Sequence, residues 1–253
     1  MNKVVFMGGK RIGHICLKIL LERAEELNAE VIAVFENRSK LSAPEDSLES
    51  VAKAQSIPVY YDMEGLFELE PFDTLISVQY HEILLPRHIE LARQLAINLH
   101  MAPLPEYRGC NQFSFALIDG AEEFGTSIHR LTPKIDGGPL LFESRFPIPE
   151  NCFVKDLYNQ TVEASIRLFE QSIASILKGE VTEVPQEKLD PNRNRGFHLR
   201  KEMADLKEIN ANWPLEKQKR YFRATWFPPF DPPQVKNGDQ ISNADMAWYN
   251  SLD

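Results

Sequence analysis

The chain has 253 residues, of which 43% are hydrophobic and 26% charged, and a formal net charge of −9 at pH 7. This composition is typical of a globular protein large enough to bury a substantial core, and the acidic balance argues against a nucleic-acid partner. No apolar run approaches the roughly 20 residues of a membrane-spanning helix and no signal-peptide pattern is present, so we expect a cytoplasmic protein without a membrane partner.

The first part of the chain alternates strand-like and helix-like segments. The apolar run at residues 4–7 predicts a buried strand, apolar side chains at helical spacing over residues 12–27 predict a helix, and residues 31–35 predict a second buried strand. This order indicates parallel pairing of the two strands. The connecting residues 8–13 fall short of the dinucleotide-binding fingerprint and lack the spacing of a Walker phosphate loop.

The next segments continue this alternation as far as residue 101. We expect a short helix at residues 47–55, strands at 57–60 and 74–78, a helix from Pro86 to about Leu95, and a strand at 96–101. Pro58 cannot donate a hydrogen bond to a neighbouring strand, which favours the edge of the sheet for its segment.

The rest of the chain divides into the end of this domain and a smaller part. We expect a helix at residues 111–118, strands at 126–131 and 140–148 joined by a turn at 133–138, and a long amphipathic helix at 153–177. These elements predict an α/β fold with a mostly parallel sheet over residues 1–178, and a small C-terminal appendage over residues 179–253. The appendage contains an aromatic, proline-rich patch at 221–233, and its polar tail at 237–253 is expected to pack weakly or to act as an oligomer arm.

Charge is distributed unevenly along the chain. Residues 190–236 contain ten Lys and Arg against six Asp and Glu, whereas residues 1–189 contain 18 against 28. A small basic region on an acidic chain favours a small phosphorylated ligand over a polymer.

Polar side chains gather on the predicted strand at residues 96–101. Because side chains alternate along a strand, Asn98 and His100 share one face. Open α/β sheets place their sites at the carboxyl ends of parallel strands, so His100 and the loop at residues 79–81 are expected to face one crevice. An amide that holds an oxyanion, an imidazole that moves a proton and a carboxylate, Asp136, that orients the imidazole would support acyl transfer without a protein nucleophile.

The same residues also fit ordinary structural roles. Asn98 and His100 can be hydrogen-bonded residues of a strand, and residues 136–138 can be a simple turn. The other histidines show no metal-ligand spacing and are interpreted as surface or core residues, and the scattered cysteines indicate neither a zinc site nor a disulfide framework, so no metal is expected. These residues are His14, His81, His88, His129, His198, Cys16, Cys110 and Cys152.

Three stretches together resemble the signature of the folate-dependent formyltransferases, namely Asn98-Leu99-His100, residues 103–109 and residues 135–141. The resemblance covers residues 1–178 and implies a Rossmann-like core that transfers the formyl group of 10-formyltetrahydrofolate to an amine. It also implies that Asn98, His100 and Asp136 are catalytic. Many members have Ser-Leu-Leu-Pro where residues 102–105 read Ala-Pro-Leu-Pro, a departure that concerns the packing of the loop.

Within this family the chain is most similar to sugar N-formyltransferases, at residues 76–81, 98–112 and 223–230. This similarity implies a nucleotide-linked amino sugar as acceptor, typically dTDP-4-amino-4,6-dideoxyglucose, a role in lipopolysaccharide O-antigen biosynthesis, and a homodimer built partly by the appendage. The implied folate contacts are Gln79, Tyr80, His81, Ile83, Leu84, Leu131 and Ile135. The implied contacts to the nucleotide sugar are Lys10, Arg11, Met101, Pro103, Arg108, Gly109, Asn111, Gln112, Phe197, Arg200, Lys201 and Trp226.

The basic region and its aromatic neighbours then acquire candidate roles. Arg195, Arg200 and Lys201 are candidates for binding the diphosphate, and Phe197 or Trp226 for packing against the base. Alternatively, the aromatic side chains form the core of the appendage and the basic ones a solvated face. Formylation of methionyl-tRNA, of glycinamide ribonucleotide or of another amine, hydrolysis of formyl-folate, and folate or nucleotide binding without catalysis stay open as alternatives.

Overall fold

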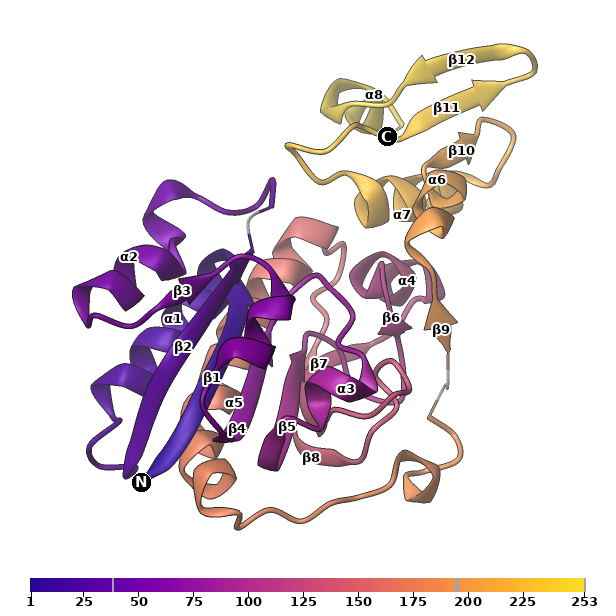
Figure 1. Ribbon diagram of the computed structural model, residues 1–253. Helices are drawn as coiled ribbons and strands as arrows, with labels where there is room; N and C mark the ends of the chain where they lie inside the picture. Colours follow the sequence, from indigo (N-terminus) through magenta and orange to yellow (C-terminus); the bar gives the residue numbers. More distant parts are fainter. Residues whose placement is uncertain (38, 194–195, 253) are drawn as a thin grey trace.

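A single mixed sheet organises the larger part of the chain. The computed structural model describes residues 1–37, 39–193 and 196–252. In this part of the chain seven strands form the sheet in the order β3-β2-β1-β4-β5-β7-β8 (Figure 1). These strands are β1 (Asn2–Gly9), β2 (Ala29–Asn37), β3 (Val59–Tyr60), β4 (Phe72–Val78), β5 (Ala92–His100), β7 (Glu123–Arg130) and β8 (Leu140–Pro147).

The strand directions create the crevice in which the candidate site lies. Strands β3, β2, β1, β4 and β5 run parallel, and β7 and β8 are antiparallel to their neighbours. The chain moves outward from β1 to β3 and returns to β4 on the other side of β1, so the strand order reverses between β1 and β4. Open α/β sheets bind ligands outside the carboxyl ends of the strands at such a reversal. The predicted parallel pairing of the first two strands and the edge position of the strand after Pro58 are both confirmed.

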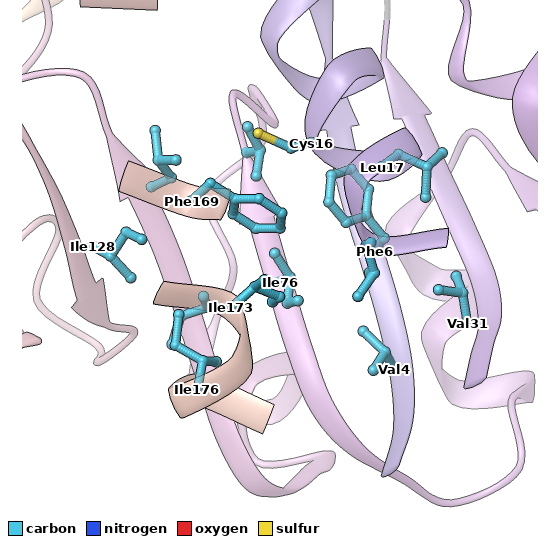
Figure 2. Packing of buried hydrophobic residues seen from close by; sticks show 14 of the residues in the cluster. Val4, Phe6, Cys16, Leu17, Val31, Ile76, Ile128, Phe169, Ile173 and Ile176 are labelled. Carbon is cyan, nitrogen blue, oxygen red and sulfur yellow. The ribbon is translucent and has the colours of Figure 1, made fainter. Parts of the chain in front are cut away.

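Helices α1 (Lys10–Glu22) and α5 (Val154–Lys178) cover one face of the sheet, with α2 (Leu48–Ala54) beside α1. Figure 2 shows Phe169, Ile173 and Ile176 of α5 packed toward the strands, with Phe6 of β1 near Leu17 of α1. All five side chains are at most 2% exposed. The buried positions of α5 recur every three or four residues, which is the pattern of a helix with one apolar face.

Shorter elements cover the opposite face. The 3-10 helix η2 (Met63–Glu68) and the single turn α3 (Pro86–Ile89) pack there. Phe35, Leu66 and Phe72 form the centre of this second cluster, and Phe35 stacks on Tyr60 with ring centroids 4.9 Å apart. Because this layer is thin, the loops at the carboxyl ends of β4 and β5 stay open to a cavity described below.

The C-terminal segment forms a smaller unit beside α4 (Gln112–Asp119), as Figure 1 shows. Its core contains Ile209, Phe222, Val235 and Ala244, and the ring of Phe222 stacks on that of Trp226. Its elements are α6 (Met203–Leu206), β10 (Glu208–Asn210), α7 (Leu215–Thr225), β11 (Gln234–Asn237), β12 (Gln240–Asn243) and α8 (Met246–Asn250). The remaining short elements are β6 (Arg108–Gly109), which pairs with β9 (Phe197–His198), and the 3-10 helices η1 (Pro44–Asp46), η3 (Gln186–Lys188) and η4 (Arg200–Glu202).

Two of the predicted helices are wrong in extent. The first helix ends at Glu22 and not at residue 27, because the chain turns there and Asn28 adopts a left-handed φ of 49°. The helix expected from Pro86 to Leu95 is one turn, since Ala92 already pairs with Phe72 of β4. In the tail at residues 237–253 every residue of β12 is exposed, which agrees with weak packing, whereas Ala244 is fully buried; the alternative of an oligomer arm stays a prediction. None of the helices in the described part of the chain is both long and apolar enough to span a bilayer.

Candidate active site

Asn98 and His100 lie at the end of β5, beside the antiparallel strand β7. In the register of these strands Asn98 pairs with His129, and His100 with Ser127. Asn98 and His100 line the same cavity, as the alternation along the strand predicts. His129 is 1% exposed, so of the two roles expected for it, surface or core, it has the core one. The sequence interpretation did not include its contact with Asn98. The available signal was the pairing of the two predicted strands, which places these residues opposite each other.

Asp136 reaches this pair from the turn that follows β7. Its Oδ1 atom lies 3.7 Å from Nδ1 of His100 and 3.6 Å from Nε2 of His129, and its Oδ2 accepts the N–H of Gly109 at 2.9 Å. Burial raises the pKa of the Asp136 carboxyl, but the charge of His100, the interaction with His129 and the Gly109 N–H outweigh burial and hold this pKa well below its ordinary range. Asp136 is therefore ionised at neutral pH.

His129 orients the amide of Asn98. Nδ1 of His129 is 2.9 Å from the carbonyl oxygen of Arg130, which can only accept, so Nδ1 carries a proton. In the neutral ring Nε2 is then the acceptor for Nδ2 of Asn98, 3.2 Å away. This assignment uses one N–H of the Asn98 amide and leaves the second for a ligand in the cavity.

The ring of His100 lies between two oxygen acceptors. Its Nε2 is 3.1 Å from the carbonyl oxygen of Tyr107, and its Nδ1 faces Asp136. Because the carbonyl oxygen can only accept, Nε2 carries a proton, and Nδ1 is the nitrogen that can take a second proton beside Asp136. The site thus combines an amide donor with an imidazole that can take a second proton beside a carboxylate, which is an arrangement that stabilises an oxyanion.

One cavity of about 1030 Å³ extends from this centre along the carboxyl ends of β1, β2, β4 and β5. Most of the residues predicted for ligand binding line this cavity, although they come from five separate segments of the chain. They are Gln79, Tyr80, His81, Ile83, Leu84, Leu131 and Ile135 from the folate set, and Lys10, Gly109, Asn111, Gln112, Phe197 and Arg200 from the nucleotide-sugar set.

The other predicted contacts lie outside this lining. Arg11 pairs with Glu163 at 2.7 Å on the surface, and Trp226 stacks on Phe222 in the core of the C-terminal unit. Met101 and Pro103 are buried, the Nε atom of Arg108 donates to the carbonyl of Gly196, and Lys201 is an exposed residue of η4. Arg195 lies outside the described residues.

Sequence reasoning missed a group of residues at the far end of the cavity. Asn37 is the last residue of β2, Lys40 lies in the next loop, and Lys207, Phe227 and Phe230 come from the C-terminal unit. Among the described lining residues five are Lys or Arg and two are Asp or Glu. The chain as a whole is acidic, so this local excess of positive charge favours an anionic ligand.

Comparisons with known proteins agree with this geometry. Residues 2–173 match the family model described as Formyl transferase. The chain is 30% identical over 193 residues to the bifunctional polymyxin resistance protein ArnA of Wigglesworthia glossinidia brevipalpis, and 30% identical over 196 residues to the methionyl-tRNA formyltransferase of Halalkalibacterium halodurans. It is 28% identical over 184 residues to the GDP-perosamine N-formyltransferase of Brucella melitensis biotype 1.

These relatives are matched over different shares of their length. The alignments cover 72%, 73% and 71% of this chain, and 29%, 61% and 67% of ArnA, the methionyl-tRNA enzyme and the GDP-perosamine enzyme, respectively. Among solved structures, an N-formyltransferase from Helicobacter canadensis in complex with folinic acid and dTDP-3-aminofucose superposes with a TM-score of 0.75 at 21% identity. That superposition covers 94% of this chain and 85% of the other, so the two chains share a fold.

Proposed function

This chain belongs to the formyl transferase family, and from that premise we propose that it moves the formyl group of 10-formyltetrahydrofolate to the amine of a nucleotide-linked amino sugar. The observation that carries the proposal is the convergence of Asn98, His100 and Asp136 on one cavity that has room for two substrates and an excess of basic residues. Neither a serine nor a cysteine lies in a nucleophile motif, so the acceptor amine itself attacks the formyl carbon.

The polar centre supplies two functions that this attack needs. The remaining N–H of Asn98 donates to the formyl oxygen, and the ring of His100, once it has taken a second proton, stabilises the charge that develops there; one such donor is worth about 10²- to 10³-fold in kcat. As the new C–N bond forms, the amine must lose a proton, and the leaving nitrogen of the folate must gain one when its bond breaks. The ring of His100, oriented by Asp136, takes the proton that the amine releases, carries the positive charge while the oxyanion exists, and gives the proton to the leaving nitrogen.

The loop after β4 and the turn after β7 suit the folate. Tyr80, Ile83, Leu84, Leu131 and Ile135 give this part of the cavity an apolar wall next to the catalytic groups. Ile83 is 60% exposed and Ile135 40% exposed, so two large apolar side chains of this wall are available for contact with a ligand. A flat pterin ring provides that cover, and the folinic acid in the Helicobacter canadensis structure supports this choice of donor.

The part of the cavity around Lys10 and Arg200 suits a nucleoside diphosphate. Nζ of Lys10 bridges the crevice between β1 and β4, 2.7 Å from Oε1 of Gln79. Burial lowers the pKa of the Lys10 ammonium, and the charge of Arg200 lowers it further. A diphosphate between these cations would relieve their repulsion, and Phe197 or Phe230 offers an apolar face for the base. The first candidate acceptor is dTDP-4-amino-4,6-dideoxyglucose.

A second candidate function is formylation of methionyl-tRNA, because a relative with that activity is 30% identical. Its weakness is the acidic charge of this chain, since tRNA binding depends on neutralising many phosphates. A formyl-folate hydrolase would use the same polar groups with water as the acceptor. A binding protein without catalysis would leave the arrangement of Asn98, His100 and Asp136 unexplained.

A panel assay separates these functions. The protein is incubated with 10-formyltetrahydrofolate and, in turn, dTDP-, GDP- and UDP-linked 3- and 4-amino sugars, methionyl-tRNA, or no acceptor. The proposal expects the mass of one formyl group to be added to a nucleotide sugar, with turnover cut about 10²- to 10³-fold in Asn98→Ala and in His100→Ala. Formylated methionyl-tRNA alone, or formate released at the same rate without an amine, would overturn it.

The division of labour along the chain is also part of the proposal. Residues 1–178 hold the catalytic groups, and residues 179–253 complete the wall for the nucleotide sugar and form a homodimer through the C-terminal unit. The exposed strand β12, whose edge carries the exposed Ile241, supports a second copy at this end. Sedimentation of the intact chain and of Ile241→Lys tests this step, and a monomeric wild-type chain would refute it.

A further inference from the structure

The segment after α5 returns to the catalytic turn. From Lys178 the chain runs along the end of the sheet, past β8, before it rises to β9 (Figure 1). Val184 is tied to the start of β8 by two backbone hydrogen bonds with Leu140, of 2.8 and 2.9 Å. These bonds lie beyond residue 173, where the match to the family model ends. They place the next residues against the turn that carries Asp136.

Gln186 is the residue of this segment that contacts the turn. Its Nε2 atom donates to the carbonyl oxygens of Asp136 and Gly138, each at 2.8 Å. The side chain is 5% exposed, so water does not compete for these carbonyls. One amide group therefore holds the main chain on both sides of Gly137.

The turn has a conformation that needs such support. Asp136 is not a glycine, yet its φ is 47°, in the left-handed region that L residues rarely adopt. A side chain at Gly138 would come within 1.9 Å of the carbonyl oxygen of Arg130, so the turn passes directly against β7. Unfavourable backbone conformations persist when the surrounding structure fixes them, and the two bonds from Gln186 fix this one.

The position of the turn sets the position of the carboxylate. Oδ1 of Asp136 is nearly equidistant from the rings of His100 and His129, at 3.7 and 3.6 Å. A shift of about 1 Å in a catalytic group can cost about 100-fold in rate. We propose that Gln186 is a positioning residue, which holds the Asp136 turn so that its carboxylate faces both histidines.

The test replaces Gln186 with methionine, which has a similar shape and no N–H donor. Gln218 is a matched control, because its Nε2 also donates to two carbonyls, those of Ala211 at 3.0 Å and Trp213 at 2.8 Å, and it is 8% exposed, but it lies in the C-terminal unit. Both variants should lower the melting temperature to a similar extent. Only Gln186→Met should lower kcat, by about 10- to 100-fold, while KM for both substrates changes by less than about threefold.

A double-mutant cycle shows whether Gln186 acts through the carboxylate. In an Asp136→Asn background, Gln186→Met should cause little further loss of kcat, since the group that it positions is gone. Equal losses in both backgrounds, or a wild-type kcat in a folded Gln186→Met variant, would overturn the proposal. Should Gln186→Met fail to fold, Gln186→Leu removes the same donors without adding a charge and serves in its place.

The measurement of kcat rests on the proposed function, so a second measurement that does not require formyl transfer is also made. The ring signals of His100 and His129 are recorded by NMR at fixed pH in the wild-type protein and in both glutamine variants. Displacement of the carboxylate should move both ring signals in Gln186→Met and leave them in place in Gln218→Met. Unmoved ring signals would refute the positioning role, whereas a wild-type protein without formyl transfer would refute only the proposed function.

Discussion

Replacing Asp136 with asparagine tests the electrostatic core of the site. The substitution keeps the shape of the side chain and removes its charge. At 3.7 Å, the carboxylate of Asp136 and a protonated ring of His100 attract each other by about 4.5 kcal/mol in surroundings of effective dielectric constant 20. Each 1.36 kcal/mol of transition-state stabilisation is a factor of ten in rate. If His100 is charged in the transition state, Asp136→Asn should therefore lower kcat by about 10³-fold.

The assay is steady-state formyl transfer to the acceptor found in the panel, with circular dichroism to show that the variant is folded. Glu36→Gln is the matched control, since Glu36 is a carboxylate of 3% exposure that accepts backbone N–H groups at the start of α2 and lies on β2, which β1 and β4 separate from β5. Its kcat should stay within about threefold of the wild type. A folded Asp136→Asn variant that keeps more than a tenth of wild-type kcat would refute the charge argument.

Three further predictions concern stability and binding. Because the folded-state pKa of Asp136 is depressed, the ionised carboxylate stabilises the fold fully above its ordinary pKa of about 3.9, and this stabilisation fades as the pH falls further. The difference in the free energy of unfolding between the wild type and Asp136→Asn, measured by urea unfolding, should therefore become smaller from pH 6 to pH 3. Lys10→Met should raise KM for the nucleotide sugar about tenfold at similar kcat, whereas Arg11→Met, which changes a surface residue outside the cavity, should not. Phe169→Ala should lower the free energy of unfolding by about 3–5 kcal/mol without changing kcat, and a loss below 1 kcal/mol in urea titrations would contradict the packing in Figure 2.

The strands and the long helix could be predicted because the local spacing of apolar residues indicates which side chains are buried. Continuous apolar runs gave β1, β2 and β4, and a single apolar stripe gave α5. The errors arose where tertiary pairing overrides local pattern. Arg93 and Gln94 resemble the polar face of a helix, yet they lie at the exposed start of β5, because the strand extends to match β4. The pairing of the start of β5 with β4 cannot be inferred from the residues around Arg93 and Gln94 alone.

The site was predictable to the extent that strand alternation and one motif define it. Asn98 and His100 share a face because they are two residues apart, and this relation survives any error in the ends of the strand. The arrangement of His129, Asp136 and Gln186 depends on which strands pair and on where a later segment returns. Trp226 shows the opposite case, since an aromatic residue in a basic region satisfies the pattern of a base-binding residue and is packed in the core of the C-terminal unit.

The left-handed Gly109 explains why the catalytic carboxylate depends on the C-terminal part of the chain. Its N–H donates to Oδ2 of Asp136, and its own strand, β6, pairs with β9. With φ at 85°, the position of a Cβ atom would lie 2.3 Å from the carbonyl oxygen of His198, so only glycine allows β9 to approach this closely. The same carbonyl also accepts the N–H of Cys110 at 2.9 Å. Asp136 is thus held from one side by Gln186 and from the other by a loop that β9 fixes, so that the residues beyond 178 shape the site as well as lining it.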